Sequence, residues 1–279
     1  MILKIKKLIW LIVCLSLTTA CGKALQKDEL SAPEVAGSFT VKVMSIGKAD
    51  AIVLMTENHT VLIDTGKRGD GKKILSYLSK KGVRKIDYMI ITHFDSDHIG
   101  GAVKLLNNIE IENIITPKYK GTNNEYVRFI NALSDNAKKQ QIITEKMSFI
   151  LDDVLFEAYP AEQNYYEESD NDFSIAVSVT HGENKFLFMG DAEETRLNEL
   201  FTQLELGHKF LKVAHHGKLA KNSEEFIKNV SPEIAVITDS VEEPCDSEVF
   251  EILESIGATV IKANEEDAEF VSDGKNIKF

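Results

Sequence analysis

Residues 91–101 read Ile-Thr-His-Phe-Asp-Ser-Asp-His-Ile-Gly-Gly. The apolar run at 88–91 leads into them and has the character of a buried parallel strand. The run stops at Thr92, and Gly100 and Gly101 then allow a tight backbone turn. Apolar residues return at helical spacing after the second glycine. The pattern predicts a strand, a polar loop at its carboxyl end, and a helix.

Four potential metal ligands crowd this loop: His93, Asp95, Asp97 and His98. Like charges repel, and removing them from water is costly unless a partner offsets the cost. A divalent cation reverses both effects, because imidazole nitrogen and carboxylate oxygen are ligands for zinc, manganese or iron. A simpler interpretation, in which Asp97 caps a helix and His93 lies on the surface, accounts for only one acidic residue. The loop therefore predicts a metal site.

The pattern Thr-His-x-Asp-x-Asp-His-x-Gly-Gly resembles the signature of the metallo-β-lactamase superfamily. The commonest form of that signature is His-x-His-x-Asp-His, so Asp95 replaces its second histidine. This variant resembles a branch that includes the hydrolase-like domain of bacterial competence proteins, which act in DNA uptake. The resemblance covers about residues 38–279. It implies an α/β fold in which two sheets pack face to face with helices outside both, a four-layer αββα sandwich.

Residues 1–20 predict an export signal rather than part of the fold. Three lysines precede an apolar segment at 8–17 that is short for a membrane span, and small residues follow. With Cys21 next, this order resembles a bacterial lipoprotein signal, cleaved before a cysteine that carries lipid. Ordinary secretion and an uncleaved anchor are the alternatives. We expect a tether at 21–37 and a metallo-β-lactamase-like domain at 38–279, held at the extracytoplasmic face of the cell membrane.

Cysteine use and charge fit an exported domain. Cys14 would leave with the signal, Cys21 would carry lipid, and Cys245 would be alone, so no intramolecular disulfide is expected. The 279-residue chain has a formal net charge of −12. A strongly acidic protein repels phosphate backbones unless its charges are arranged locally. The charge therefore weighs against a nucleic-acid substrate.

Apolar periodicity predicts alternating strands and helices in two halves. The expected strands are 39–46, 51–55, 61–63, 88–91, 113–116, 142–143, 149–150, 154–159, 174–180, 185–189, 210–214, 234–237, 259–261 and 270–271. The expected helices are 71–81, 123–139, 195–206 and 247–255. The polar segment 162–172 is expected to be a surface loop that can overhang a site.

The second half supplies the remaining ligand candidates. Asp191 lies in a Gly-Asp-Ala sequence that resembles a family motif whose carboxylate bridges two metal ions. His215 and His216 end a predicted strand, and because neighbouring strand residues face opposite sides, one of them is expected to ligate. We favour His215 as the ligand and His216 as a polar neighbour that contacts substrate, and the opposite assignment stays open. His181, at a predicted hairpin tip, is expected to be a turn residue.

Other positions bear on the family pattern. Asp64 begins an Asp-Thr-Gly sequence, which in the superfamily orders the metal loop through hydrogen bonds and is otherwise a common turn. Residues 171–174 resemble an Asn-x-x-Ser stretch found where other members place a histidine ligand. Three positions depart from the pattern: Ala49 replaces a glycine, Lys218 replaces a serine, and Glu243 stands where related sequences place a histidine.

The resemblance implies a binuclear metallo-hydrolase, in which a metal-activated hydroxide attacks an ester or phosphodiester. The expected metal ligands are His93, Asp95, Asp97, His98, Asp191 and His215. Asp97 is also expected to orient the nucleophile as a base, and His216 to donate a proton to the leaving group. The two ions would be zinc or manganese, and the oxygen ligand Asp95 shifts the preference toward manganese.

Three functions remain open from the sequence. The first is a hydrolase of small-molecule or envelope esters or phosphodiesters outside the cytoplasmic membrane. The second is a non-catalytic binding lipoprotein that keeps the metal cage, favoured by the three departures from the family pattern. The third is a nuclease that assists DNA uptake, which the acidic charge disfavours.

Overall fold

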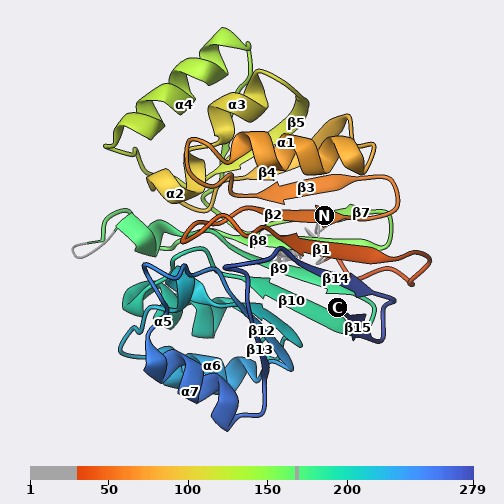
Figure 1. The fold of residues 1–279 in the computed structure, drawn as a ribbon, viewed down its shortest axis with the longest axis vertical. Helices are drawn as coiled ribbons and strands as arrows, with labels where there is room; N and C mark the ends of the chain where they lie inside the picture. Colours follow the sequence, from red (N-terminus) through yellow and green to blue (C-terminus); the bar gives the residue numbers. More distant parts are fainter. Residues whose placement is uncertain (1–29, 167–169) are drawn as a thin grey trace, which may run out of the picture.

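The computed structural model describes residues 30–166 and 170–279, which form two mixed β-sheets with helices outside both (Figure 1). The predicted export signal at 1–20, Cys21 and the predicted tether before residue 30 lie outside the described residues. Within the described ranges, every helix is too short or too polar to cross a bilayer.

The first sheet has eight strands in the order β15-β14-β1-β2-β3-β4-β5-β6. Its strands are β1 (Phe39–Val43), β2 (Ile52–Met55), β3 (Thr60–Ile63), β4 (Lys85–Ile90), β5 (Glu110–Thr116), β6 (Gln141–Ile142), β14 (Ala268–Ser272) and β15 (Ile277–Lys278). Pairing is antiparallel from β15 to β3 and parallel from β3 to β6. The carboxyl ends of β3, β4 and β5 therefore lie at one edge of the sheet.

The second sheet has seven strands in the order β13-β12-β11-β10-β9-β8-β7. Its strands are β7 (Met147–Leu151), β8 (Val154–Tyr159), β9 (Ala176–His181), β10 (Asn184–Phe188), β11 (Phe210–Lys212), β12 (Ile234–Ile237) and β13 (Thr259–Lys262). Its pattern repeats that of the first sheet, because β7 to β10 pair antiparallel and β10 to β13 pair parallel. The carboxyl ends of β10, β11 and β12 share an edge in turn.

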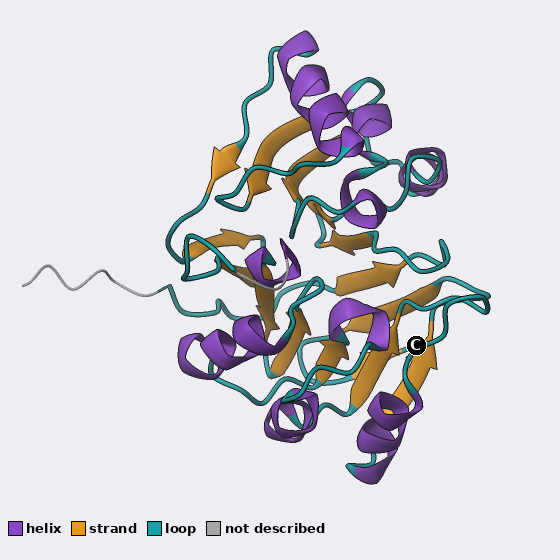
Figure 2. Ribbon diagram, turned by 90° about the vertical axis from the view of Figure 1, so that its left-hand side faces the viewer, coloured by secondary structure: helices purple, strands orange, loops and turns teal. Residues whose placement is uncertain are grey.

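Helices cover the outer face of each sheet (Figure 2). Those of the first half are α1 (Gly71–Lys80), α2 (Ser96–Ile99), α3 (Ala102–Leu106) and α4 (Asn124–Asp135). Those of the second half are α5 (Glu194–Gln203), α6 (Ser223–Val230) and α7 (Ser247–Ser255). Two 3-10 turns, η1 (Asp170–Phe173) and η2 (Ala214–Gly217), lie beside the strand ends. The predicted four-layer αββα sandwich is confirmed.

Three apolar clusters account for the layers. Between the sheets, the alternating Phe39, Val41 and Val43 of β1 pack against phenylalanines of the second sheet, with the Phe39 and Phe186 ring centroids 5.2 Å apart. Outside the first sheet, α1, α3 and α4 bury their apolar faces on the strands. Outside the second sheet, α5, α6 and α7 do the same. Each face is buried because its apolar residues recur at the period of its own element.

The sequence-based boundaries differ from the structure at particular points. The predicted helix 123–139 ends at Asp135. The helical spacing predicted after Gly101 corresponds to α3, whereas α2 lies within the ligand loop and was not predicted. Helix α6 and strand β15 were not predicted. The predicted strand 210–214 stops at Lys212, and the chain then enters the turn η2, which changes the orientation of the two histidines there.

Candidate metal centre

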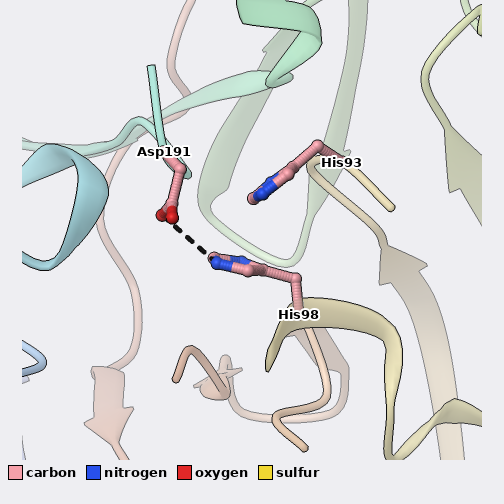
Figure 3. Close-up of side chains that lie close together, drawn as sticks. All are labelled: His93, His98 and Asp191. Carbon is pink, nitrogen blue, oxygen red and sulfur yellow. Dashed lines mark ion pairs between the residues drawn. The ribbon is translucent and has the colours of Figure 1, made fainter. Parts of the chain in front are cut away.

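The ligand candidates lie where parallel strands of both sheets end. The loop after β4 carries His93, Asp95, Asp97 and His98, and the segments after β10 and β11 carry Asp191 and the two histidines of η2. Figure 3 shows His93 and His98 from the first half facing Asp191 from the second. His98 Nε2 lies 3.2 Å from Asp191 Oδ1.

Four groups of side chains in the described part of the chain have donor atoms close enough to share a cation. One group consists of three predicted ligands, His93, His98 and Asp191. A second group combines the predicted ligands Asp97 and His98 with His216. Within each group the donor atoms all lie within 4.8 Å of one another. Because His98 belongs to both, the two groups are contiguous.

Hydrogen bonds donated by Nδ1 orient the imidazoles of His93, His98 and His216. His98 Nδ1 lies 2.8 Å from Asp64 Oδ2, and His93 Nδ1 lies 3.1 Å from Thr92 Oγ1. Thr92 Oγ1 donates its own hydrogen to Asp64, so it accepts one from His93. His216 Nδ1 lies 3.1 Å from the carbonyl oxygen of Thr238. Each ring therefore carries its Nδ1 hydrogen away from the cluster and directs Nε2 into it.

The atoms directed into the cluster lack ordinary partners. Among the described residues, the Nε2 atoms of His93, His98 and His216 and the Oδ1 atom of Asp191 are buried without a hydrogen-bond partner. Buried polar atoms are normally satisfied, because an unpaired one costs about 1–3 kcal/mol. Imidazole nitrogens and carboxylate oxygens that converge in this way fit divalent cations.

The electrostatics of the cluster agree with cation binding. Burial, aided by the charge of His98, lowers the pKa of His93 to about 3, so its imidazole is neutral at pH 7. Burial alone would raise the pKa of Asp191, but His216 and His98 outweigh it and hold that pKa well below its usual range. Burial also opposes ionisation of Asp97, yet the nearby imidazoles of His216 and His98 lower its pKa. Two ionised carboxylates thus stand beside a neutral imidazole.

Asp95 lies at the solvent side of the cluster. Its side chain is 48% exposed, and its Oδ2 atom is 3.9 Å from His93 Nε2. Burial raises its pKa, with Asp97 and Asp191 adding to the increase against the opposing charge of His98. Asp95 therefore stands near His93 but outside the four compact groups.

The two neighbouring histidines of η2 have different surroundings. Both have left-handed backbone angles, with φ of 47° at His215 and 54° at His216, so the alternation expected of a strand does not apply. His216 is buried, and its Nε2 lies 3.2 Å from Asp191 Oδ2 and 3.5 Å from Asp97 Oδ2. His215 is partly exposed, with Nε2 3.9 Å from Asp191 Oδ2 and Nδ1 3.1 Å from Glu193. The structure places His216 among the carboxylates and His215 at their rim.

Asp64 and Asp50 are buried carboxylates that make hydrogen bonds to residues around the cluster. Asp64 accepts hydrogen bonds from the Thr92 amide (2.8 Å) and hydroxyl (2.7 Å) and so connects β3 to the ligand loop. Asp50, which sequence reasoning did not select, is fully buried, accepts a 2.6 Å hydrogen bond from Thr238 and pairs with Lys212. Its position in a Gly-x-x-Asp sequence before a strand was the one signal that could have identified it.

Three further positions from the sequence analysis, His181, Glu243 and Lys218, belong to none of the four groups. His181, predicted to be a turn residue, is instead the last residue of β9, where it is buried and its Nδ1 lies 2.8 Å from Ser272 Oγ. Glu243 is a surface carboxylate, 57% exposed and 3.7 Å from Lys48. Lys218 pairs with Asp246 at 3.0 Å. The position expected to carry a substrate-side histidine thus carries a surface acid.

A surface groove of about 280 Å³ adjoins the rim of the cluster. It is lined by His215 and Glu193 on one side and by Lys218, Leu219 and Lys221 on the other. Lys221 pairs with Glu194 at 2.9 Å, so the groove carries charges of both signs. Because it lies beside His215, this groove can hold part of a substrate.

The chain is similar in sequence to much longer curated proteins. The chain is 27% identical over 245 residues to Recombination protein 2 of Haemophilus influenzae, covering 85% of this chain and 28% of that protein. It is 25% identical over 225 residues to ComE operon protein 3 of Bacillus subtilis, covering 74% of this chain and 29% of that protein. The chain thus spans less than a third of the length of these relatives.

Solved structures share the fold at low sequence identity. The metallo-beta-lactamase fold protein YhfI of Bacillus subtilis superposes with a TM-score of 0.56 at 11% identity, covering 84% of this chain and 100% of that one. CmlA, a diiron beta-hydroxylase from Streptomyces venezuelae, superposes with a TM-score of 0.52 at 11% identity, covering 85% and 54%. The family description "Metallo-beta-lactamase superfamily" matches residues 46–238, more than half of the chain. The chain belongs to the metallo-beta-lactamase superfamily.

Proposed function

We propose that this protein is a metal-dependent hydrolase of esters or phosphodiesters. One observation carries the proposal: three imidazoles from both halves of the sandwich, each fixed through Nδ1, direct unpartnered Nε2 atoms toward Asp191 and Asp97. Oriented histidines beside ionised carboxylates are the ligand set of hydrolytic metal centres.

We assign two divalent ions to the cluster. Asp191 would be shared, with His93 and Asp95 on one side and Asp97, His98 and His216 on the other. When bound, the ions would activate water and stabilise the negative charge that develops on the substrate. The oxygen ligand Asp95 favours manganese over zinc on its side. In this assignment His216, rather than His215, is the ligand from the histidine pair.

The chain's own residues position the reactants. The nearby imidazoles of His216 and His98 favour the ionised form of Asp97, so its carboxylate can orient the attacking water. His215 lies at the rim beside the groove, with Glu193 Oε1 3.1 Å from its Nδ1. Because Glu193 contacts Nδ1, the Nε2 atom of His215 can contact a substrate in the groove. We therefore assign the substrate contact, which the sequence analysis expected of His216, to His215.

The proposed location is the extracytoplasmic face of the cell membrane, with a lipid on Cys21. The order of basic, apolar and small residues before that cysteine supports it. Expression of Cys21→Ala in a bacterium should move the chain from the membrane fraction to the soluble fraction. An unchanged distribution would contradict the lipid anchor.

Ion content and turnover test the hydrolase proposal. The purified chain, stripped with a chelator and reloaded with Mn²⁺ or Zn²⁺, should bind two ions and hydrolyse bis-(p-nitrophenyl) phosphate or a p-nitrophenyl ester. Asp97→Ala should lower the rate by about a hundredfold or more, because the oriented carboxylate is lost. Bound ions without hydrolysis of any ester would contradict a hydrolase.

A non-catalytic metal-containing lipoprotein is the second candidate. The exposed acid Glu243, where the family places a histidine, favours it. In that case the chain would bind the ions and hydrolyse no ester, and Asp97→Ala would behave like the parent.

A nuclease that assists DNA uptake is the third candidate, favoured by the names of the relatives, which include Competence protein ComA of Neisseria gonorrhoeae at 29% identity over 202 residues. Its test is salt-sensitive retardation of DNA by the purified chain. We expect no retardation, because the formal net charge is −12.

A further inference from the structure

A buried lysine lies beneath the candidate metal centre. Lys212 ends β11 and is fully buried, and its ammonium contacts the carboxylate of Asp50, which is also buried. Removing an ammonium from water is costly unless a partner compensates. A lysine at this depth therefore depends on Asp50.

Asp50 joins the two halves of the sandwich. Its backbone amide donates to the carbonyl of Asp97 at 3.1 Å, within the ligand loop of the first half. Its side chain accepts from Thr238 Oγ1 at 2.6 Å and pairs with Lys212, both in the second half. Thr238 in turn holds His216 Nδ1, at 3.1 Å from its carbonyl and 3.0 Å from its hydroxyl. A continuous chain of contacts thus runs from Lys212 to a proposed ligand.

Asp50 also has the position of a competing ligand. It belongs to two of the four groups that could share a cation, one with Asp64 and His98 and one with Asp191 and His216. Its carboxylate lies 3.5 Å from His216 Nδ1. Without a fixed countercharge, this carboxylate would be free to turn toward a bound ion or to take the hydrogen bond of His216 from Thr238.

We propose that Lys212 is a built-in cation that withholds Asp50 from the metal ions, so that Asp50 and Thr238 position His216 instead. Lys212, Asp50 and Thr238 are positioning residues in this scheme, since they act on the ions through His216. The inference rests on the proposed two-ion centre and adds to it a buried charge pair that sets which carboxylates ligate. A purely structural pair would affect folding but leave ion binding unchanged.

A double-mutant cycle on ion binding tests the charge pair. The purified full chain, Lys212→Met, Asp50→Asn and the double variant are each titrated with Co²⁺, whose visible absorption reports the number and kind of ligands. We expect each single variant to change the Co²⁺ affinity about tenfold or more, on the scale seen for groups that orient ligands. Lys212→Met should also alter the spectrum, because the freed Asp50 joins the ion. The double variant should return to within about threefold of the parent, because the charge balance is restored.

A neutral pair of variants tests the positioning of His216 without changing charge. Thr238→Val removes the hydroxyl and keeps the shape, and should weaken Co²⁺ binding about tenfold. Thr238→Ser keeps the hydroxyl and should bind within about threefold of the parent. This pair decides the question if Lys212→Met does not fold.

Two results would overturn the inference. One is a folded Lys212→Met variant, confirmed by circular dichroism, with the affinity and spectrum of the parent. The other is Thr238→Val binding Co²⁺ as Thr238→Ser does. By contrast, a parent chain that shows the expected cycle but hydrolyses no ester would overturn the hydrolase proposal and leave this inference standing.

Discussion

Neighbouring residues in this protein acquire different roles because their side chains have different surroundings. His215 and His216 are neighbours with similar left-handed angles, yet His216 is buried among carboxylates and His215 is partly exposed at the rim. Left-handed angles cost non-glycine residues about 1–3 kcal/mol and persist only where surrounding contacts enforce them. The Thr238 and Glu193 contacts of the two rings supply that enforcement.

Exchange of each histidine separates ligand from rim residue. His216→Gln should reduce the bound ions from two to about one per chain, because it removes an Nε2 atom directed at Asp191. His215→Gln, the matched control, should keep both ions and lower only the rate of turnover. Atomic absorption on the purified variants measures this. Loss of an ion from His215→Gln with retention in His216→Gln would reverse the assignment.

Gly101 illustrates how closely the ligand loop approaches its neighbours. A Cβ at this position would lie 2.1 Å from the carbonyl oxygen of Thr65, which is backbone and cannot move aside cheaply. Gly101→Ala should therefore lower the free energy of unfolding by about 1–3 kcal/mol or more. Gly69→Ala is the control, because no atom lies within 4 Å of its added Cβ, and it should change stability by less than about 0.5 kcal/mol. Urea unfolding compares them, and equal effects would contradict the close approach.

At the scale of elements, the candidate ligands lie at the ends of strands. Strands β3, β4, β10, β11 and β12 all end at the cluster, which brings Asp64, the ligand loop, Asp191, His216 and Thr238 together. The opposite strand ends hold a separate buried network, in which His208 Nε2 lies 2.9 Å from Ser178 Oγ of β9. That network lies apart from the proposed ligands, so its titration can be read independently.

His208 should make stability depend on pH. Burial, aided by the charge of Lys185, lowers the pKa of His208 to about 4, below the value near 6.5 expected in the unfolded chain. Between these pKa values the unfolded chain binds a proton that the folded chain does not, so stability falls as pH drops through this window. The loss at pH 5 should be about 2 kcal/mol relative to pH 8, at roughly 1.4 kcal/mol per pKa unit.

The variant His208→Gln isolates this contribution, because a neutral amide cannot take up the proton. Urea unfolding of parent and variant at pH 5 and pH 8 gives the difference in pH dependence, and other titrating groups cancel in the comparison. An identical pH dependence in the two proteins would refute the role of His208.

At the scale of the whole molecule, the cluster lies at the junction of the two halves. Figure 1 places β4 and α1 to α4 on one side and β10 to β12 with α5 to α7 on the other. Burial of the Asp191 and Asp97 carboxylates is costly, and among the described residues His98 and His216 offset part of that cost. Cations that bind across the junction should therefore stabilise the folded chain as a unit.

Ion loading should raise the midpoint of thermal unfolding. A ligand at a hundred times its Kd adds about 2.7 kcal/mol to the free energy of unfolding. For a domain of this size that corresponds to a rise of roughly 5–10 °C. Differential scanning fluorimetry with Mn²⁺ or Zn²⁺ against a chelator measures the shift, and His216→Gln should show a smaller one. If the midpoint of thermal unfolding of the parent did not change with ions, a cation site at the junction would be contradicted.

The sequence by itself determined the short-range features of this protein. Alternation at 39–43 and helical spacing at 71–81 predicted β1 and α1, because the period of apolar residues follows from local backbone geometry. The crowding of acids and histidines at 93–98 predicted a metal site, because a cation offsets the repulsion between these groups and the cost of removing them from water. The family signature then supplied the four-layer sandwich.

Only the tertiary structure decided which side chains meet. Asp50 and Lys212 are 162 positions apart in the sequence and pair only because the two sheets stack. The turn after β11 sets which histidine faces the carboxylates, and that turn depends on contacts with Thr238 and Glu193 rather than on local propensity. Periodicity reports the face of an element, whereas the partner of a buried charge depends on where distant elements end.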